Sequence, residues 1–256
     1  ATEDYKFGFY TSGPPNSFCA REYDRAAFDL PNYLIVKAAG NDRNEGPNGA
    51  VTHYVWNSGW VPSTAPRPND GGTTGFDTLD SVSTAKNILT VGAVNDLVGG
   101  YNPQAPQNVQ VASFSAFGPT DDGRIKPDIV ANGSTLTSPI ATTNNAYAAY
   151  SGTSMAAPSV SGSLGLLVQR RAATGQPPLS AAALKAVVIH TADECGNPGP
   201  DYKYGWGLMN TKKAAELITQ DVTTTRIIIE GVINNAQTIT HPIHMPGGTI
   251  YKVTLC

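Results

Sequence analysis

The stretch AAYSGTSMAAPSVSGSLGLLVQ, residues 148–169, places a serine between small residues at the start of an apolar segment. Its apolar residues recur at helical spacing, at Val160, Leu164, Leu167 and Val168. This pattern predicts a helix from about Ser154 to Gln169. Unpaired N–H groups at a helix start carry partial positive charge and would stabilise an anion beside Ser154. On these letters alone, Ser154 could equally be an ordinary helix N-cap.

The segments on either side predict an α/β protein. Short apolar runs indicate buried strands, and capped segments with apolar residues three and four apart indicate helices. The expected strands are 32–40, 86–94, 109–118 and 126–134. The other expected helices are 16–30, 180–193 and 210–220. A helix followed by a buried strand is a signature of the α/β class.

Two parts of the chain do not follow this pattern. Residues 41–80 are rich in Gly, Pro, Asn and Asp without a sustained period, which suggests a functional loop or an insertion. Residues 221–256 are β-rich with no helix between the runs TTTRIIIEGVI and TIYKVTLC. We therefore expect two units, an α/β unit over 1–220 and the beginning of a β domain over 221–256.

The composition excludes several classes of protein. The 256 residues carry a net charge of −3, so nothing favours a nucleic-acid partner. No apolar run approaches the ~18 residues that a membrane span needs. The three cysteines, Cys19, Cys195 and Cys256, show neither metal-ligand spacing nor a disulfide framework.

Several motifs then resemble, in order, those of the subtilases, the subtilisin-like serine proteases. SGTSMAAPSVSG is similar to the nucleophile motif G-T-S-M-A-x-P of that family, and LIVKAAGND is similar to its oxyanion-asparagine segment. ASFSAFGPTDDGRIKPDIVANGS and YGWGLMNTKKAAEL resemble two later blocks. The resemblance covers about residues 5–220 and is closest to the branch with a C-terminal β-sandwich domain. It implies that residues 1–220 are a partial subtilisin-like catalytic domain, with a three-layer fold in which helices flank a parallel sheet whose N-terminal part is missing. It also implies a secreted or cell-envelope endopeptidase that acts on polypeptides.

The resemblance also implies residue roles. Ser154 would be the nucleophile, and the Asn41 side-chain amide and the Ser154 N–H would bind the oxyanion. Without the resemblance, the interpretation of Asn41 is a turn residue that follows a strand. The implied substrate-binding residues are Ala38, Ala39, Gly40, Gly152 and Thr153.

The Asp and His of the family's triad have no counterpart here, because neither D-[ST]-G nor H-G-T occurs upstream of Asn41. Of the four histidines, His190 is expected to be packed in a helix, and His241 and His244 of the β tail are expected at the surface or in turns. His53 lies in the 41–80 segment and could approach a cleft, but nothing in the family pattern makes it the base. We therefore expect an inactive fragment whose exposed sheet edge is covered by an oligomer or a swapped partner. Oxyanion binding alone retains only about 10³–10⁴-fold acceleration.

Two other functions compete with a protease. A non-catalytic module for binding peptides or partners would explain the missing triad residues but not the presence of both Ser154 and Asn41. An esterase or lipase would need G-x-S-x-G, whereas the local string is G-T-S-M-A. No cofactor is required, and no metal-binding residue is assigned. Structural calcium is compatible with the acidic loops at 41–48 and 69–80, which we otherwise expect to be solvated.

Overall fold

The computed structural model describes residues 5–6, 20–43, 52–65, 71–223, 227–242, 248 and 251–256. Its helices are α1 (Ala20–Asp29), α2 (Thr153–Ala173), α3 (Ala181–Thr191) and α4 (Thr211–Thr223), with a short 3-10 helix, η2, at Pro106–Asn108. The helix expected over 180–193 is confirmed, with Ser180 as its N-cap accepting a hydrogen bond from Ala183 N. The helix expected over 210–220 continues to Thr223 as α4.

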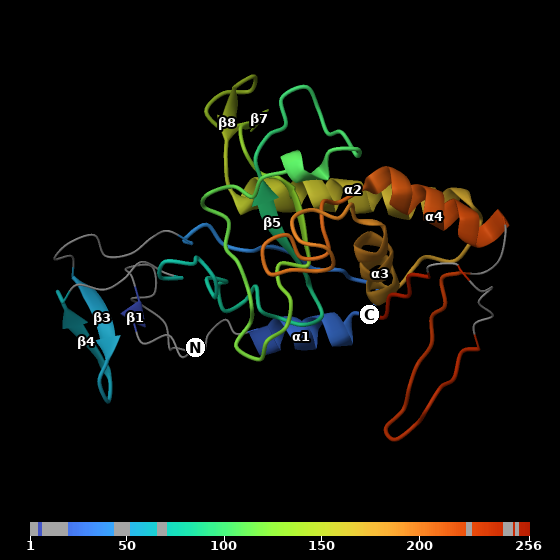
Figure 1. Cartoon of the computed structure of the whole chain (residues 1–256), viewed down its shortest axis with the longest axis horizontal. Helices are drawn as coiled ribbons and strands as arrows, with labels where there is room; N and C mark the ends of the chain where they lie inside the picture. The colour runs from blue at the N-terminus through green and yellow to red at the C-terminus, as the bar shows by residue number, and fades with distance from the viewer. Residues whose placement is uncertain are drawn as a thin grey trace.

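A three-stranded parallel sheet lies at the centre of the molecule (Figure 1). Its strand order is β2 (Val36–Ala38), β5 (Leu89–Val94) and β6 (Ile129–Asn132). Val36 pairs with Leu89, and Val91 pairs with Ile129. β5 is buried along its whole length, as its continuous apolar sequence predicted. The α/β class with a parallel sheet is therefore confirmed.

α2 crosses the sheet and contacts all three of its strands, and α4 packs against α2 and α3. The apolar residues of α2 that face the sheet are fully buried, at Val160 and Leu167. The core cluster joins them to Leu89, Val91 and Ile129. This packing fixes the direction of α2, and hence the position of its first turn, relative to the carboxyl end of β2.

Two hairpins were not expected. Within 41–80, β3 (His53–Trp56) and β4 (Trp60–Ser63) pair antiparallel, and β1 (Tyr5–Lys6) pairs with β3. β7 (Leu136–Pro139) and β8 (Tyr147–Tyr150) form a second hairpin that leads directly into α2. The sequence showed no alternating pattern strong enough to identify either hairpin.

One expected strand was wrong, and the expected β domain stays a prediction. The segment 109–118 forms no strand; Val111 makes an isolated bridge to Val94, and the chain turns where Ser115 N donates to Ala112 O at 3.0 Å. The described residues of the β-rich tail, 227–242, 248 and 251–256, also contain no strand. The tail lacks a ladder there even though its β-branched composition favours one.

Candidate functional site

The first turn of α2 presents Ser154 to solvent beside buried neighbours. Gly152 precedes the helix with extended backbone, and its N–H donates to Gly133 O at 2.8 Å. Ser154 is exposed, whereas the Thr153 side chain is fully buried. Among the described residues, the Ser154 N–H donates no hydrogen bond. An exposed hydroxyl therefore lies next to an unused helix N-terminal donor.

Asn41 is held at the carboxyl end of β2 by a residue 112 positions away in sequence. Thr153 N donates to Asn41 Oδ1 at 2.8 Å, and Thr153 Oγ1 donates to the same oxygen at 2.9 Å. Gly40 N in turn donates to Thr153 Oγ1 at 3.3 Å. These bonds assign the amide orientation, because only the oxygen can accept from both donors.

The fixed oxygen leaves the Asn41 nitrogen as the outward group of the amide. In the described part of the chain, Asn41 Nδ2 donates to no acceptor. A Cβ on Gly152 would lie 3.7 Å from this nitrogen, which shows how closely Asn41 approaches the turn that leads into α2. Asn41 Nδ2 and the Ser154 N–H are thus two unused donors at one end of α2.

The predicted substrate-binding residues fall into two groups. Gly40, Gly152 and Thr153 surround Asn41, as the bonds above describe. Ala38 and Ala39 belong to the sheet: Ala38 O accepts from Ser83 Oγ at 2.8 Å, and Ala39, fully buried, donates from N to Val91 O at 3.0 Å. With their side chains buried, Ala39 and Thr153 can meet a substrate only through main-chain atoms.

Two residues that the sequence did not single out support this geometry. Gly133, at the end of β6, is buried, and a Cβ there would lie 2.5 Å from Ala93 Cβ and 2.8 Å from Gly152 O. Arg43 follows Asn41 closely, donates to the carbonyls of Ala112 and Ser113, and places its guanidinium 4.1 Å from the Phe117 ring centroid. From the sequence, only the position of Gly133 directly after a strand could have drawn attention to it. No sequence pattern pointed to Arg43.

No described histidine side chain contacts Ser154. His190 is half-buried on α3, where its Nδ1 lies 3.0 Å from Thr254 Oγ1. Burial lowers the pKa of His190, and the nearby Lys252 ammonium lowers it further. His241 is exposed, and the side chains of His53 and His244 lie outside the described residues. The packed role expected for His190 agrees with its position.

The acidic loops do not form a metal site in the part of the chain that the structure describes. No three His, Cys, Asp or Glu side chains gather there. Asp80 already has partners on both oxygens: Oδ1 accepts from Val82 N and Ser83 N, and Oδ2 accepts from Lys37 Nζ at 2.7 Å. The described residues of these loops do not fit a calcium site, and residues 44–48 and 69–70 lie outside the description.

A parallel sheet covered by helices, with an exposed serine at a helix start and an asparagine at a strand end, defines an α/β protein with a polar site at one end of α2. The chain belongs to the Subtilase family, because the model of that family, peptidase S8, matches residues 10–207. Among the described residues, no helix is both long and apolar enough to span a bilayer.

Three curated proteases are similar in sequence. Serine protease AprX of Bacillus subtilis is 28% identical over 213 residues, 75% of this chain and 45% of AprX. C5a peptidase of Streptococcus pyogenes is 37% identical over 116 residues, 41% of this chain and 10% of that protein. Pyrolysin of Pyrococcus furiosus is 32% identical over 180 residues, 61% of this chain and 13% of pyrolysin. The chain therefore spans less than half the length of these relatives.

Solved structures support the fold alone. The self-cleaved protease domain of PatA superposes with a TM-score of 0.52 at 20% identity, covering 78% of this chain and 54% of the PatA chain. The PatG macrocyclase in complex with peptide gives a TM-score of 0.50 at 23% identity, covering 77% of this chain and 46% of that chain.

Proposed function

We propose that this chain supplies the nucleophile and the oxyanion-binding groups of a secreted serine endopeptidase. The observation that carries the proposal is the pair of hydrogen bonds from Thr153 to Asn41 Oδ1, at 2.8 and 2.9 Å. They turn Asn41 Nδ2 outward, close to the turn from which the exposed Ser154 emerges. A neutral amide fixed in advance is a good oxyanion donor, because it needs no reorganisation during the reaction.

The proposed reaction is acyl transfer. Ser154 Oγ attacks the peptide carbonyl carbon while a base takes its proton, and the carbonyl oxygen becomes an oxyanion. Asn41 Nδ2 and the Ser154 N–H donate to that oxygen. Collapse of the intermediate breaks the C–N bond, the amine leaves with the proton, and water then hydrolyses the acyl-enzyme on Ser154. The reaction needs no cofactor.

The base is the part of this mechanism that the chain does not supply. Neither D-[ST]-G nor H-G-T precedes Asn41 in the sequence. We propose that the histidine and its aspartate belong to polypeptide outside these 256 residues, and that this chain alone is inactive. Without a base, a serine hydroxyl remains protonated near neutral pH and is a poor nucleophile.

Three further proposals rest on the family resemblance. We propose that the catalytic unit ends at about residue 220 and that a β domain begins after it. We assign the whole of α4, which ends at Thr223, to the catalytic unit. We also propose export from the cell, which detection of the protein in culture medium would test. Structural calcium remains a proposal for residues outside the described loops.

The test is to express the chain together with its upstream coding sequence and to assay casein hydrolysis. We expect hydrolysis that Ser154→Ala abolishes. Ser159→Ala is the matched control, because Ser159 is also exposed on α2 and its Oγ donates to Met155 O within the helix. Activity that survives Ser154→Ala would contradict the proposal. An upstream sequence without the Asp and His motifs would favour a binding module instead.

Asn41→Asp gives the second test in the same longer protein. The carboxylate can still accept both Thr153 hydrogen bonds, so we expect the variant to fold. It cannot donate to an oxyanion and brings a negative charge to it, so kcat should fall by at least about 10²–10³-fold. An unchanged kcat with a raised KM would show that Asn41 does not stabilise the oxyanion.

A further inference from the structure

Arg43 lies two positions after Asn41 and is bound to a segment 69 positions further along the chain. Its Nη2 donates to Ala112 O at 3.1 Å and also to Ser113 O. Its guanidinium carbon lies 4.1 Å from the centroid of the Phe117 ring. A planar guanidinium can donate to carbonyls and cover an aromatic ring at the same time, which an ammonium group cannot. Arg43 therefore holds the chain just after Asn41 against residues 112–117.

Residues 112–117 are themselves fixed to the central sheet. Ala112 N donates to Ala93 O at 2.9 Å, and Ala93 N donates to Ser115 Oγ at 3.0 Å, so both main-chain groups of one residue of β5 bind this segment. Ala112 and Ser115 are fully buried, and Phe117 is buried as well. Buried segments with buried hydrogen bonds open least readily. Anything bound to residues 112–117 is thus held in place relative to the sheet.

The same segment also holds Gly40, on the other side of Asn41. Ala116 N donates to Gly40 O at 3.0 Å. A Cβ on Gly40 would lie 3.3 Å from Ala116 Cβ, so the two stretches of chain are in close contact. Asn41 therefore lies between two attachments to one fixed segment, through Gly40 and Arg43, while Thr153 binds its amide oxygen from the start of α2.

The attachment at Arg43 comes just before the chain leaves the site. Figure 1 shows β3 and β4, which follow in sequence, well apart from the central strand β5. The chain has returned by Gly75, where a Cβ would lie 3.1 Å from Arg43 Cδ. Arg43 thus fixes the main chain after Asn41 at the point where the excursion begins.

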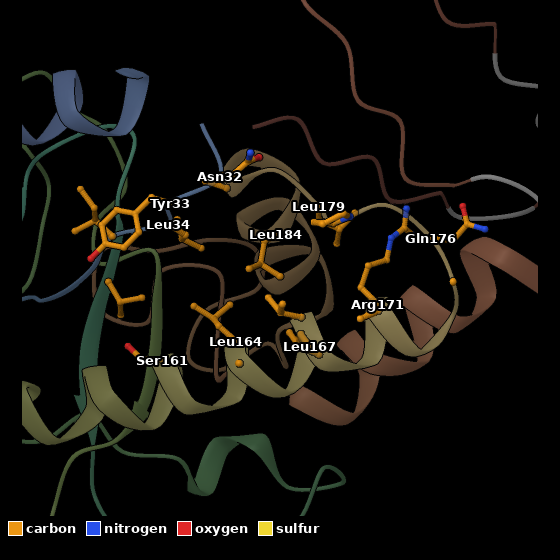
Figure 2. Close-up of a pocket in the computed structure, with 18 residues that line it drawn as sticks. Asn32, Tyr33, Leu34, Ser161, Leu164, Leu167, Arg171, Gln176, Leu179 and Leu184 are labelled. Atoms are coloured by element: carbon orange, nitrogen blue, oxygen red, sulfur yellow. The ribbon is translucent and has the colours of Figure 1, made fainter. Parts of the chain in front are cut away.

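The apolar groove of about 770 Å³ between residues 32–36 and helices α2 and α3 takes no part in this attachment. Figure 2 shows that Leu34, Leu164 and Leu184 extend into it, and its described lining contains neither Asn41 nor Arg43. The proposed function places further polypeptide of the same catalytic unit outside these residues, so this face offers no separate binding site. The hold on Asn41 is independent of the groove.

We propose that Arg43 is a positioning residue for the reaction: it fixes the main chain after Asn41 and so keeps Asn41 Nδ2 where the oxyanion forms. This inference rests on the proposed function, in which that nitrogen donates to the oxyanion. The guanidinium acts without touching substrate, because two carbonyls and an aromatic ring already occupy it. A displacement of about 1 Å in a catalytic group can cost about 10²-fold in rate. Loss of Arg43 therefore lowers kcat and leaves KM nearly unchanged.

The test uses the longer protein that includes the upstream coding sequence, with kcat and KM measured on a peptide that the wild type cleaves. We expect Arg43→Met to lower kcat by about 10–10²-fold and to change KM by less than about threefold. Arg43→Lys keeps the charge but cannot make all three contacts, so kcat should still fall by at least about tenfold. Circular dichroism checks folding, and Arg43→Lys carries the test if Arg43→Met does not fold.

Arg170→Met is the matched control for these variants. Arg170 is exposed near the far end of α2 from Ser154, and its Nε donates to Thr219 Oγ1 at 3.0 Å. This variant also loses an arginine and a hydrogen bond, but it should leave kcat and KM unchanged. A fall in kcat as large as that of Arg43→Met would overturn the proposal.

Asn41→Ala separates positioning from a general structural role. With the oxyanion donor gone, Arg43 has no donor to position, so adding Arg43→Met should lower kcat by less than about twofold. An equal loss with and without Asn41 would show that Arg43 supports the structure in general, and would overturn the proposal. Arg43 variants with an unchanged kcat also overturn it. A raised KM with that unchanged kcat would mean that Arg43 contacts substrate.

Ser154→Ala in the same assay tests the proposed function separately. If hydrolysis is absent, or survives Ser154→Ala, the proposed function fails and this inference fails with it. If Ser154→Ala abolishes hydrolysis while the Arg43 variants behave as the wild type, only this inference fails.

Discussion

Thr153 shows how one buried side chain can prepare a neighbour for chemistry without taking part in it. Its hydroxyl and its N–H both bind Asn41 Oδ1, and its hydroxyl oxygen accepts from Gly40 N. Two segments of the chain, residues 40–41 and the start of α2, are therefore joined through Asn41 Oδ1 and Thr153 Oγ1, and neither oxygen needs to touch a substrate. The position of the proposed oxyanion donor depends on a residue that solvent does not reach.

Thr153→Val tests this arrangement in the chain alone. The side chains have nearly the same shape, but the valine side chain neither donates to Asn41 Oδ1 nor accepts from Gly40 N. The half-buried Gly40 N–H then loses its partner, and Asn41 Oδ1 keeps only the bond from the main-chain N of residue 153. We expect the free energy of unfolding to fall by about 1–3 kcal/mol in urea titrations. Thr137→Val on β7 is exposed and should change stability by less than about 0.5 kcal/mol. Equal effects of the two variants would contradict the assigned role.

The sequence was informative about the residues that perform chemistry and silent about those that position them. Ser154 and Asn41 were identifiable because the strings GTSMAAP and KAAGND resemble known motifs. The structure now brings both to one end of α2. The anchoring role of Thr153 was not predictable, because its partner lies 112 residues away and no local pattern encodes such a contact. Arg43 escaped notice for the same reason.

At the scale of elements, the close approach of β6 to the start of α2 depends on Gly133. Its carbonyl accepts from Gly152 N at 2.8 Å, and no side chain fits between the two segments. Gly133→Ala would push the end of β6 away from the turn that carries Ser154. We expect a loss of about 1–3 kcal/mol in the free energy of unfolding, as for other overpacked sites.

A glycine inside α2 provides the control for this prediction. Gly162 is exposed, and a Cβ there would meet nothing within 4 Å. Gly162→Ala should therefore stabilise the chain by about 0.5–1 kcal/mol, because alanine favours the helix. Thermal or urea unfolding of the two variants side by side measures both effects. A neutral Gly133→Ala would mean that β6 and α2 can move apart freely.

Prediction of elements succeeded where local signals were strong. Ser180 caps α3 through a bond to Ala183 N, and both residues lie in the predicted segment. It failed at 109–118, where alternating apolar residues resemble a strand but the chain turns at Ala112 and leaves one bridge to β5. It also missed β3, whose partners β1 and β4 pair through contacts that composition does not encode.

At the scale of the whole molecule, a buried ion cluster joins the sheet to α3. Lys126 Nζ donates to Asp128 Oδ2 at 2.6 Å, to Thr90 Oγ1 at 3.0 Å and to Ile88 O at 3.2 Å. Lys185 on α3 lies 2.9 Å from the other oxygen of Asp128. Two ammonium groups thus share one carboxylate at the start of β6. Such a cluster links three segments, but two cations and one anion do not neutralise each other.

This imbalance makes the stability of the folded chain depend on pH. Burial lowers the pKa of Lys126 to about 8 from its ordinary 10.5, and the attraction of Asp128 only partly opposes this effect. Between these two values the unfolded chain binds more protons than the folded chain, so stability rises with pH across that window. The cost of burying the charge is complete below pH 8 and disappears gradually above it.

Lys126→Met removes the titrating group and therefore this rise. From pH 8 to pH 10, the wild type should gain about 2 kcal/mol of unfolding free energy relative to the variant, measured by urea titration at each pH. Other groups that titrate in this range are present in both proteins, so their effects cancel in the difference. Lys212→Met, whose side chain is 84% exposed, should run parallel to the wild type. If the unfolding free energies of the wild type and of Lys126→Met change in parallel with pH, the Lys126 ammonium stays charged throughout this range. The cluster would then join the sheet to α3 without making stability depend on alkaline pH.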